Sequence, residues 1–460
     1  MDKKNLTKDQ WVEIGQKMIA DRQKRIDTAK GRKFDTVATH GIYDLDVALE
    51  SNNGSIMEPV YLTPAQAYRN SAEMEAGLAY EMPNWCYSRI ANPSTYFLEE
   101  TVALLETYGS DIEATCVATS SGMSAIRTAT DPFLVVDKNY PKPNIVTSAK
   151  VYGGTFQQFS VRRGIEQGVE VRWVKESTNN AEWESLIDEN TRFVYGEFPS
   201  NPSVAVFDIS EVAKFAHKFN APLIVDTTCA SPALTRPLTL GADIVIQSAS
   251  KVIGASGTSI AGLMTAKKNI TSKIGEDGMK ADFGTWAKFW PFRDNGPNMH
   301  PMAAIMTLND LRSIRSRVAQ MSKSALEVAK WLEKHPKIAE VNYPGLESNA
   351  SHELAKKYMI LADTDESMYG YTMSVVIKEE DENVPTNAIK FYDGLKMIWR
   401  ATDLGRVKTV ATLNAISTHQ QQGEEGRSLA SIKPSNCRIA IGIEDPEDII
   451  KELETALAEI

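Results

Sequence analysis

The sequence predicts an α/β protein with a mainly parallel seven-stranded sheet in a large domain and a smaller α+β domain at its C-terminal end. Between residues 113 and 266, short apolar runs alternate with segments of helical spacing. This pattern is typical of a parallel sheet that helices cover on both faces. The seven runs are EATCVATS, NIVTSA, VEVRWVKE, TRFVYGEF, APLIVDTT, ADIVIQSAS and IAGLMTA. Near residue 300 the rhythm changes to one long helical stretch and then to a new α+β pattern, which indicates a second domain.

These changes in pattern divide the chain into three parts. Residues 1–92 show little periodicity and contain the polar stretch LESNNGSIMEP, so we expect an extended N-terminal arm with loops, which begins with a surface helix. Residues 93–300 form the large domain, whose first helix is capped by Ser94 or Thr95 and ends before Gly109. Residues 301–460 form the smaller domain and end in the helix DPEDIIKELETALAEI.

Composition argues against several classes of protein. The 460 residues are 42% hydrophobic and 24% charged, which is ordinary for a globular chain. No apolar run approaches the ~20 residues of a membrane span, and the N-terminal segment lacks the apolar core of a secretory signal. We therefore expect a cytoplasmic protein without a membrane partner. The net charge of −10 argues against nucleic acid as a partner. The four cysteines form no CxxC pair and no metal spacing with the histidines, so we expect reduced thiols and no metal.

Polar residues follow three of the apolar runs, where an open α/β sheet binds ligands beyond the carboxyl ends of its strands. Asp226 ends one run, and Lys251 follows the next. Taken alone, the aspartate suits a turn or cap and the lysine suits a solvated loop. Upstream, a run leads through the turn at 120–122 into a helix, whose N–H groups suit a phosphate. Pyridoxal phosphate would use all three positions, because it has a phosphate, a pyridine nitrogen for an acid and an aldehyde for a lysine.

The sequence resembles the Cys/Met-metabolism family of pyridoxal-phosphate enzymes, which includes cystathionine synthases and lyases, methionine γ-lyase and O-acetylhomoserine sulfhydrylase. The resemblance runs from about residue 34 to the C-terminus and depends on seven motifs in order. They are YSRIANPS (87–94), SSGMSAI (120–126), VYGGTF (151–156), EFPSNPS (197–203), VDTTCASPALTRPLTLGADIVIQSASK (225–251), HPKIAEVNYPGL (335–346) and RIAIGIEDPEDII (438–450). It implies the fold type I of pyridoxal-phosphate-dependent transferases.

The resemblance implies a role for each matching residue around the cofactor. Lys251 would hold the cofactor aldehyde in a Schiff base, Asp226 would keep the pyridine nitrogen protonated, and Tyr152 would stack on the ring. These three are the catalytic candidates. The other cofactor-binding candidates within the subunit are Ser121, Gly122, Met123, Asn201, Ser248 and Ser250.

Further matching residues imply a substrate and a subunit partner. Arg438 would bind the α-carboxylate of a small amino-acid substrate, since its planar fork meets a carboxylate bidentately. Tyr87 and Arg89 match residues that reach the phosphate of the neighbouring subunit, and Tyr87 is also a substrate-binding candidate. The resemblance therefore implies a homo-oligomer, a dimer with shared sites that symmetry pairs into a tetramer.

The leading hypothesis is γ-replacement on an O-activated homoserine with sulfide or a small thiol. Gly154 stands where methionine γ-lyases typically have cysteine, and ISTHQQ (416–421) is most similar to the TTHQQ of O-acetylhomoserine sulfhydrylases. Two positions depart from the family: LNAIS (413–417) replaces HPAS or NPAS, and Asp403 replaces serine or asparagine. We take Asp403 as a substrate-binding candidate that attracts a cationic or polar group; the alternative is a salt bridge with a residue such as Arg406.

Three alternatives stay open at this point. A γ-lyase would release 2-oxobutanoate and ammonia from a sulfur amino acid. A catalytically silent pyridoxal-phosphate-binding protein is disfavoured, because the lysine, aspartate and arginine of the motif set are all present. A nicotinamide oxidoreductase is disfavoured, because no GxGxxG follows the first strands.

Overall fold

The centre of the molecule is a seven-stranded sheet in the computed structural model, which describes residues 3–460. Its order is β1-β7-β6-β5-β4-β2-β3, and only β7 runs antiparallel to its neighbours. The strands are β1 (Ala114–Thr119), β2 (Asn144–Ser148), β3 (Glu170–Val174), β4 (Thr191–Glu197), β5 (Leu223–Asp226), β6 (Ile244–Gln247) and β7 (Gly262–Lys267). The seven apolar runs of the sequence are these seven strands, and the expected mainly parallel α/β sheet is confirmed.

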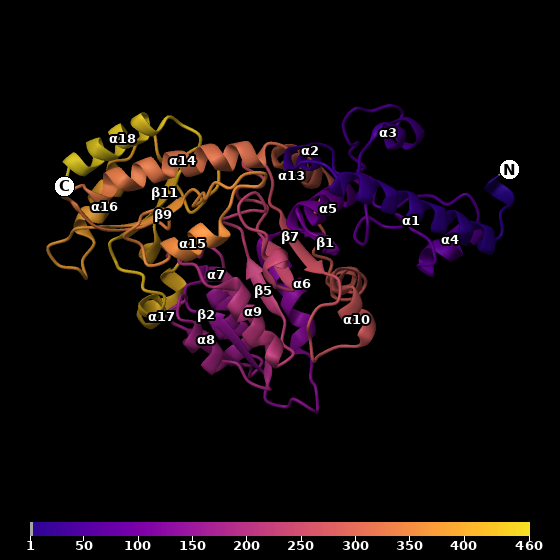
Figure 1. Ribbon diagram of the computed structural model, residues 1–460, viewed down its shortest axis with the longest axis horizontal. Coiled ribbons are helices and arrows are strands. Elements are labelled where there is room, and N and C mark those ends of the chain that lie inside the picture. The colour runs from indigo at the N-terminus through magenta and orange to yellow at the C-terminus, as the bar shows by residue number, and fades with distance from the viewer. Residues whose placement is uncertain (1–2) are drawn as a thin grey trace.

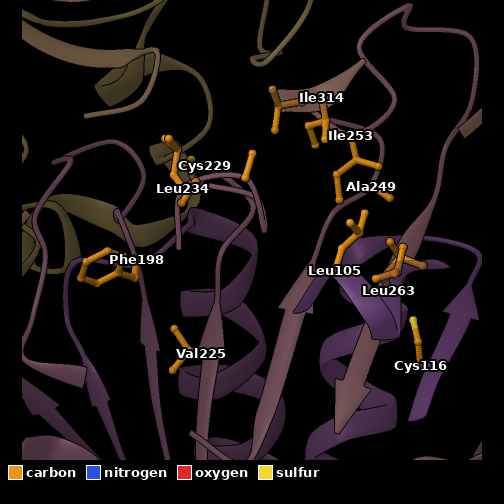
Figure 2. Close-up of a cluster of buried hydrophobic side chains, with 14 of the residues drawn as sticks. Leu105, Cys116, Phe198, Val225, Cys229, Leu234, Ala249, Ile253, Leu263 and Ile314 are labelled. Atoms are coloured by element: carbon orange, nitrogen blue, oxygen red, sulfur yellow. The ribbon is translucent and has the colours of Figure 1, made fainter. Parts of the chain in front are cut away.

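Helices cover both faces of this sheet, because successive strand residues point to opposite faces. Val225 and Leu263 belong to one buried cluster with Leu105, as Figure 2 shows. Ile224 and Met264 belong to the cluster on the other face. The first cluster includes residues of α5 (Pro93–Glu106) and α9 (Ile209–Lys218), and the second includes residues of α6 (Gly122–Thr130) and α11 (Phe283–Ala287).

The start of α5 differs from the prediction by two to three residues. Its N-cap is Asn92, whose side chain accepts a hydrogen bond from the Ser94 amide at 2.9 Å, and the expected caps Ser94 and Thr95 lie inside the helix. Pro93 at the first helical position places the start there.

A five-stranded sheet lies in the C-terminal part of the chain, beside the long helix α14 (Ile314–Glu333) (Figure 1). Its order is β10-β11-β12-β9-β8. The strands are β8 (Ile338–Asn342), β9 (Thr372–Ile377), β10 (Trp399–Arg400), β11 (Val410–Leu413) and β12 (Asn436–Ala440). Helices α14, α16 (Thr386–Gly394) and α18 (Pro446–Ala458) contribute to its buried cluster.

The N-terminal part is more helical than the sequence pattern predicts. It contains α1 (Lys8–Lys30), α2 (Phe34–His40), α3 (Leu45–Ser51) and α4 (Ser71–Leu78). Thr7 and Gln10 form a capping box at the start of α1. Only three residues of this 23-residue helix are buried, so little apolar periodicity marks it in the sequence. Figure 1 shows α1 and α4 extending away from the two sheets.

Shorter elements complete the fold. The remaining α-helices are α7 (Gly153–Gln157), α8 (Asn180–Leu186), α10 (Asp277–Ala281), α12 (Arg293–Asn295), α13 (Pro301–Leu311), α15 (His352–Tyr358) and α17 (Gly423–Leu429). Within residues 3–460, none of the helices has both the length and the apolar character that a membrane crossing requires. All four cysteines are free, and no cluster of metal-binding side chains occurs in this described part of the chain.

Candidate active site

A cavity of about 470 Å³ lies at the carboxyl ends of the parallel strands. The large sheet contributes residues after β1, β4, β5 and β6, and the five-stranded sheet contributes Arg438 and the loop between β10 and β11. All predicted site residues except Tyr87 and Arg89 line it. They are Ser121, Gly122, Met123, Tyr152, Asn201, Asp226, Ser248, Ser250, Lys251, Asp403 and Arg438.

The N-terminus of α6 approaches the end of β6 closely enough to form an anion cradle. Ser121 is the N-cap of α6, and its hydroxyl accepts a hydrogen bond from the Ser124 amide at 3.2 Å. A Cβ added to Gly122 would lie 2.8 Å from the Cβ of Ser248, so only glycine permits this approach. The helix N-terminus and the serines around it suit a phosphate group. Ser250 is already engaged, because its hydroxyl donates to the Ala261 carbonyl at 3.1 Å.

Asp226 ends β5 and is 9% exposed at the cavity wall. Its carboxylate accepts hydrogen bonds from the Thr228 amide at 2.9 Å and from the Tyr195 hydroxyl at 3.3 Å. Burial raises the pKa of Asp226 above its ordinary value. A buried carboxylate is costly without a cation, and a protonated ring nitrogen facing it would supply one.

Glu197 is a second acid in the same wall that the sequence analysis did not select. It ends β4 and pairs in register with Asp226 on β5. One of its carboxylate oxygens accepts the Tyr152 amide at 2.7 Å, and the other accepts the Asn201 amide at 3.1 Å. Burial and the nearby Asp226 raise the pKa of Glu197 well above its ordinary value. Its position at a strand end, in the motif EFPSNPS, is the signal that could have identified it.

Lys251 follows β6, and Asp403 lies on the loop between β10 and β11. The lysine Nζ is 2.6 Å from Oδ1 of Asp403. The other carboxylate oxygen, Oδ2, accepts a hydrogen bond from Nε of Arg406 at 2.5 Å. Asp403 therefore forms the salt bridge with Arg406 and also has a cationic partner inside the cavity. That partner is Lys251 of the same chain.

Arg438 on β12 is only 1% exposed, with its guanidinium at the cavity. It donates to Oδ1 of Asn201 at 2.9 Å and to the main-chain oxygen of Asp403 at 2.6 Å. Its Nε has no hydrogen-bond partner among the described residues. Burial lowers the pKa of Arg438. A buried guanidinium bonded to neutral oxygens suits a carboxylate ligand.

Tyr152 lies where the loop after β2 enters α7 and is the N-cap residue of that helix. Its ring lies edge-on to the ring of His419, with 6.5 Å between the ring centroids. His419 is fully buried, and burial together with Arg438 lowers its pKa to about 4. Tyr152 is partly exposed and lines the cavity, so its side chain is accessible to a ligand there.

Continuous hydrogen bonds connect these groups around the cavity. They run from the Tyr152 amide through Glu197, Asn201, Arg438 and Asp403 to Lys251. This series of hydrogen bonds begins beside the large sheet, crosses to β12 and returns to Lys251 in the loop that follows β6. Arg438 and Asp403 therefore join the C-terminal part of the chain to Asn201 and Lys251 of the large domain.

Tyr87 and Arg89 lie outside the cavity of their own subunit. The guanidinium of Arg89 is 5.5 Å from the ring centroid of Tyr87, and it donates to the main-chain oxygen of Arg293. Both residues are exposed. Their contact with a neighbouring subunit stays a prediction.

The residues of the cavity fit pyridoxal phosphate. The α6 N-terminus beside Ser248 can hold an anion, Asp226 can face a protonated ring nitrogen, and Lys251 offers an amine inside the same cavity. The raised pKa of Asp226 and the unpartnered Nε of Arg438 mark buried groups that a charged ligand would satisfy.

Comparisons with known proteins agree with this fit. The sequence model of the family described as Cys/Met metabolism PLP-dependent enzyme matches residues 39–458. A homocysteine synthase from Schizosaccharomyces pombe is 33% identical, with 92% of this chain and 98% of the relative covered. An L-methionine gamma-lyase from Fusobacterium nucleatum subsp. polymorphum is also 33% identical, with 90% and 96% covered.

A solved structure has the same architecture. The putative O-acetylhomoserine (thiol)-lyase from Campylobacter jejuni aligns with a TM-score of 0.79 and 27% identity over 93% of this chain and 100% of that one. That structure contains an N'-pyridoxyl-lysine-5'-monophosphate residue. The fold and the cofactor that the resemblance implied are thereby confirmed.

Proposed function

The chain belongs to the Cys/Met metabolism family of pyridoxal-phosphate-dependent enzymes, and we propose that it replaces the γ-substituent of an O-activated homoserine with sulfide or a small thiol. It is an enzyme of sulfur amino-acid metabolism that uses pyridoxal phosphate. Relatives named as a homocysteine synthase, an O-acetyl-L-homoserine sulfhydrylase and an O-succinylhomoserine sulfhydrylase support γ-replacement. Relatives named L-methionine gamma-lyase keep γ-elimination as the second candidate.

The contact between Gly154 and Tyr152 is the observation that favours γ-replacement over γ-elimination. A Cβ on Gly154 would lie 2.6 Å from Cε1 and 3.1 Å from Cδ1 of Tyr152. The cysteine typical of methionine γ-lyases therefore cannot occupy position 154 unless the Tyr152 ring moves. Since Tyr152 is the residue proposed to stack on the cofactor, this chain is suited to a reaction that needs no thiol at this position.

The roles of the residues follow from their chemistry. Pyridoxal phosphate, when bound, delocalises negative charge from the substrate Cα. Lys251 would bind the cofactor aldehyde, and its released Nζ would take the proton from Cα. Asp226 would hold the proton on the pyridine nitrogen, and the α6 N-terminus would hold the phosphate. Arg438 would fix the substrate α-carboxylate and so orient the Cα–H bond toward Lys251.

Paired assays with O-acetylhomoserine, with and without sulfide, test this function. We expect homocysteine with sulfide and little 2-oxobutanoate without it. Equal rates of 2-oxobutanoate release in both assays would overturn the proposal in favour of a γ-lyase. L-Methionine as sole substrate serves as a second arm, because a γ-lyase would release 2-oxobutanoate from it and the proposed enzyme would not.

The proposal includes an obligate dimer that shares its active sites, paired into a tetramer. Tyr87 and Arg89 are exposed on the N-terminal part, where they are available to a second subunit. The apolar residues Met18, Ile19, Leu45 and Leu49 of α1 and α3 are exposed as well, which favours a protein surface against them.

Mixing two inactive variants tests the shared site. A Lys251→Ala chain and an Arg89→Ala chain should regain part of the activity after subunit exchange, because some hybrid sites contain both intact residues. Arg89 should contribute a charge-assisted hydrogen bond to phosphate of roughly 1.5–3 kcal/mol. Confirmed subunit exchange without any return of activity would contradict the shared-site arrangement. A location in the cytoplasm stays a prediction from the sequence.

A further inference from the structure

Asp403 connects the cofactor lysine to the five-stranded sheet through a single carboxylate. Its Oδ1 is 2.6 Å from Nζ of Lys251, and both side chains are only partly exposed, at 30% and 25%. The same Oδ1 accepts the Leu404 amide at 2.9 Å. Serine and asparagine, the residue types usual at this position in the family, cannot form an ion pair with lysine. The ion pair therefore requires the aspartate at position 403.

Arg406 keeps this carboxylate in place. Its Nε donates to Oδ2 of Asp403 at 2.5 Å, and its Nη1 donates to the Gly254 carbonyl at 2.9 Å. Burial alone would raise the pKa of Asp403, but its bonds to Lys251 and Arg406 outweigh burial and lower that pKa. The carboxylate is therefore ionised at neutral pH, and it keeps one cationic partner when the lysine leaves.

We propose that Asp403 is a positioning residue that holds the Lys251 ammonium before the cofactor is captured and receives it again once the released lysine has taken the proton from Cα. The proposal rests on the proposed role of Lys251 as the cofactor lysine. Capture joins Nζ to the aldehyde carbon and releases one water molecule. It requires the ammonium to lose a proton to solvent first, and the ion pair opposes that loss.

Two consequences follow for the protein without cofactor. The ion pair slows cofactor capture, because part of its energy is lost before Nζ can react. An exposed or half-exposed ion pair changes such a rate by roughly two- to fivefold. Asp403 also limits the access of other electrophiles to Lys251, so the free lysine reacts slowly with acylating reagents until Asp403 is replaced.

Rapid mixing of the apo-protein with pyridoxal phosphate measures the first consequence through the yellow absorbance of the bound cofactor. Asp403→Ser and Asp403→Asn should both capture the cofactor faster than the wild type at neutral pH. Arg406→Gln should capture it no faster, because Asp403 then has Lys251 as its only cationic partner. Asp277→Ser is the matched control, since Asp277 is fully exposed and pairs with Lys280 at 3.7 Å outside the cavity.

Acylation of Lys251 in the apo-protein, measured by peptide mass spectrometry, is the second readout and needs no turnover. Lys251 should be labelled faster in both Asp403 variants and at the wild-type rate in Asp277→Ser. Wild-type capture and labelling rates in both Asp403 variants would overturn the proposal, as would slower rates. Circular dichroism identifies a variant that fails to fold. If Asp403→Ser does not fold, the rates of the isosteric Asp403→Asn variant test the proposal.

A Lys251→Ala arm separates this inference from the proposed function. Loss of covalent capture in Lys251→Ala, together with wild-type rates in the Asp403 variants, rejects the role of Asp403 alone. Covalent capture that persists in Lys251→Ala rejects Lys251 as the cofactor lysine and the inference with it.

Discussion

The two walls of the cavity differ in whether their carboxylates are paired with cationic side chains. On the wall made by the large sheet, Asp226 and Glu197 lie side by side, neither forms an ion pair with a residue of the described range 3–460, and burial raises the pKa of both. On the wall that includes the five-stranded sheet, Asp403 is bonded to Lys251 and Arg406, and its pKa is lowered. The first wall therefore requires a positive group from a ligand, whereas the second wall is already paired and must exchange partners when a ligand binds.

Lys251 lies where the two walls meet, so its removal should have the largest effect. We expect Lys251→Ala to lose the yellow absorbance, the borohydride-reducible cofactor and at least on the order of 10³-fold in turnover. Lys218→Ala is the control, because Lys218 pairs with Glu184 on the surface and should change none of these quantities. Reducible cofactor on another lysine in Lys251→Ala would contradict the assignment.

Asp226→Asn tests the unpaired wall. The amide preserves shape but removes the charge that would hold the pyridine proton, so we expect retained cofactor and roughly 10²–10³-fold lower turnover. Near-normal turnover would mean that Asp226 is structural.

The apo-protein provides a second measurement on Asp226, the dependence of its unfolding free energy on pH. The folded-state pKa of Asp226 is raised, so the apo-protein loses stability as pH rises from the unfolded-state value of 3.8 through the shifted value. Asp226→Asn should lose less stability over that range.

His419 tests the region around Arg438, where burial and the guanidinium both disfavour an added positive charge. Its pKa falls from 6.5 to about 4, because burial and Arg438 both oppose its protonation. Above pH 6.5 the folded protein has its full stability. As pH falls from 6.5 toward 4, the unfolded chain binds a proton that the folded chain excludes, which costs up to about 3 kcal/mol.

Urea unfolding at neutral pH and at the acidic end of this window measures the effect. His419→Gln should lose less stability on acidification than the wild type does. His40→Gln, at an exposed position, is the control and should follow the wild type. An unchanged pH dependence in His419→Gln would show that other groups dominate acid unfolding.

The cavity wall formed by the large sheet could be predicted from the sequence, because its residues all follow from the ends of parallel strands. Strands in a parallel sheet end at the same edge, so Asp226, Lys251 and the turn before α6 meet there. The same rule applies to Glu197, because it ends β4 at the same edge, although it was not among the predicted site residues. The surface helix expected at the N-terminus is α1. Helices α2, α3 and α4 were not predicted, because each has only one to three buried residues and therefore little apolar periodicity.

The contacts across the two sheets could not be predicted in the same way. Lys251 and Asp403 are 152 residues apart, and no periodicity relates a loop after β6 to a loop before β11. The resemblance predicted a substrate-binding role for Arg438, but it could not predict the hydrogen bonds of Arg438 to Asn201 and to the main chain of Asp403. Only the pair of Asp403 and Arg406, three residues apart, had a local signal, and the sequence analysis kept it as an alternative.

The bond between Asp403 and Arg406 restricts how this site can diverge. Serine at 403 with Arg406 retained would leave a partly buried guanidinium with the Gly254 carbonyl as its remaining partner. Loss of Arg406 alone would leave Lys251 as the cationic partner of the Asp403 carboxylate. Each single change is therefore expected to be less tolerated than the double change, and the two effects should not add. Related sequences in which Asp403 has been replaced should therefore also have a replacement of Arg406, and the reverse should hold as well.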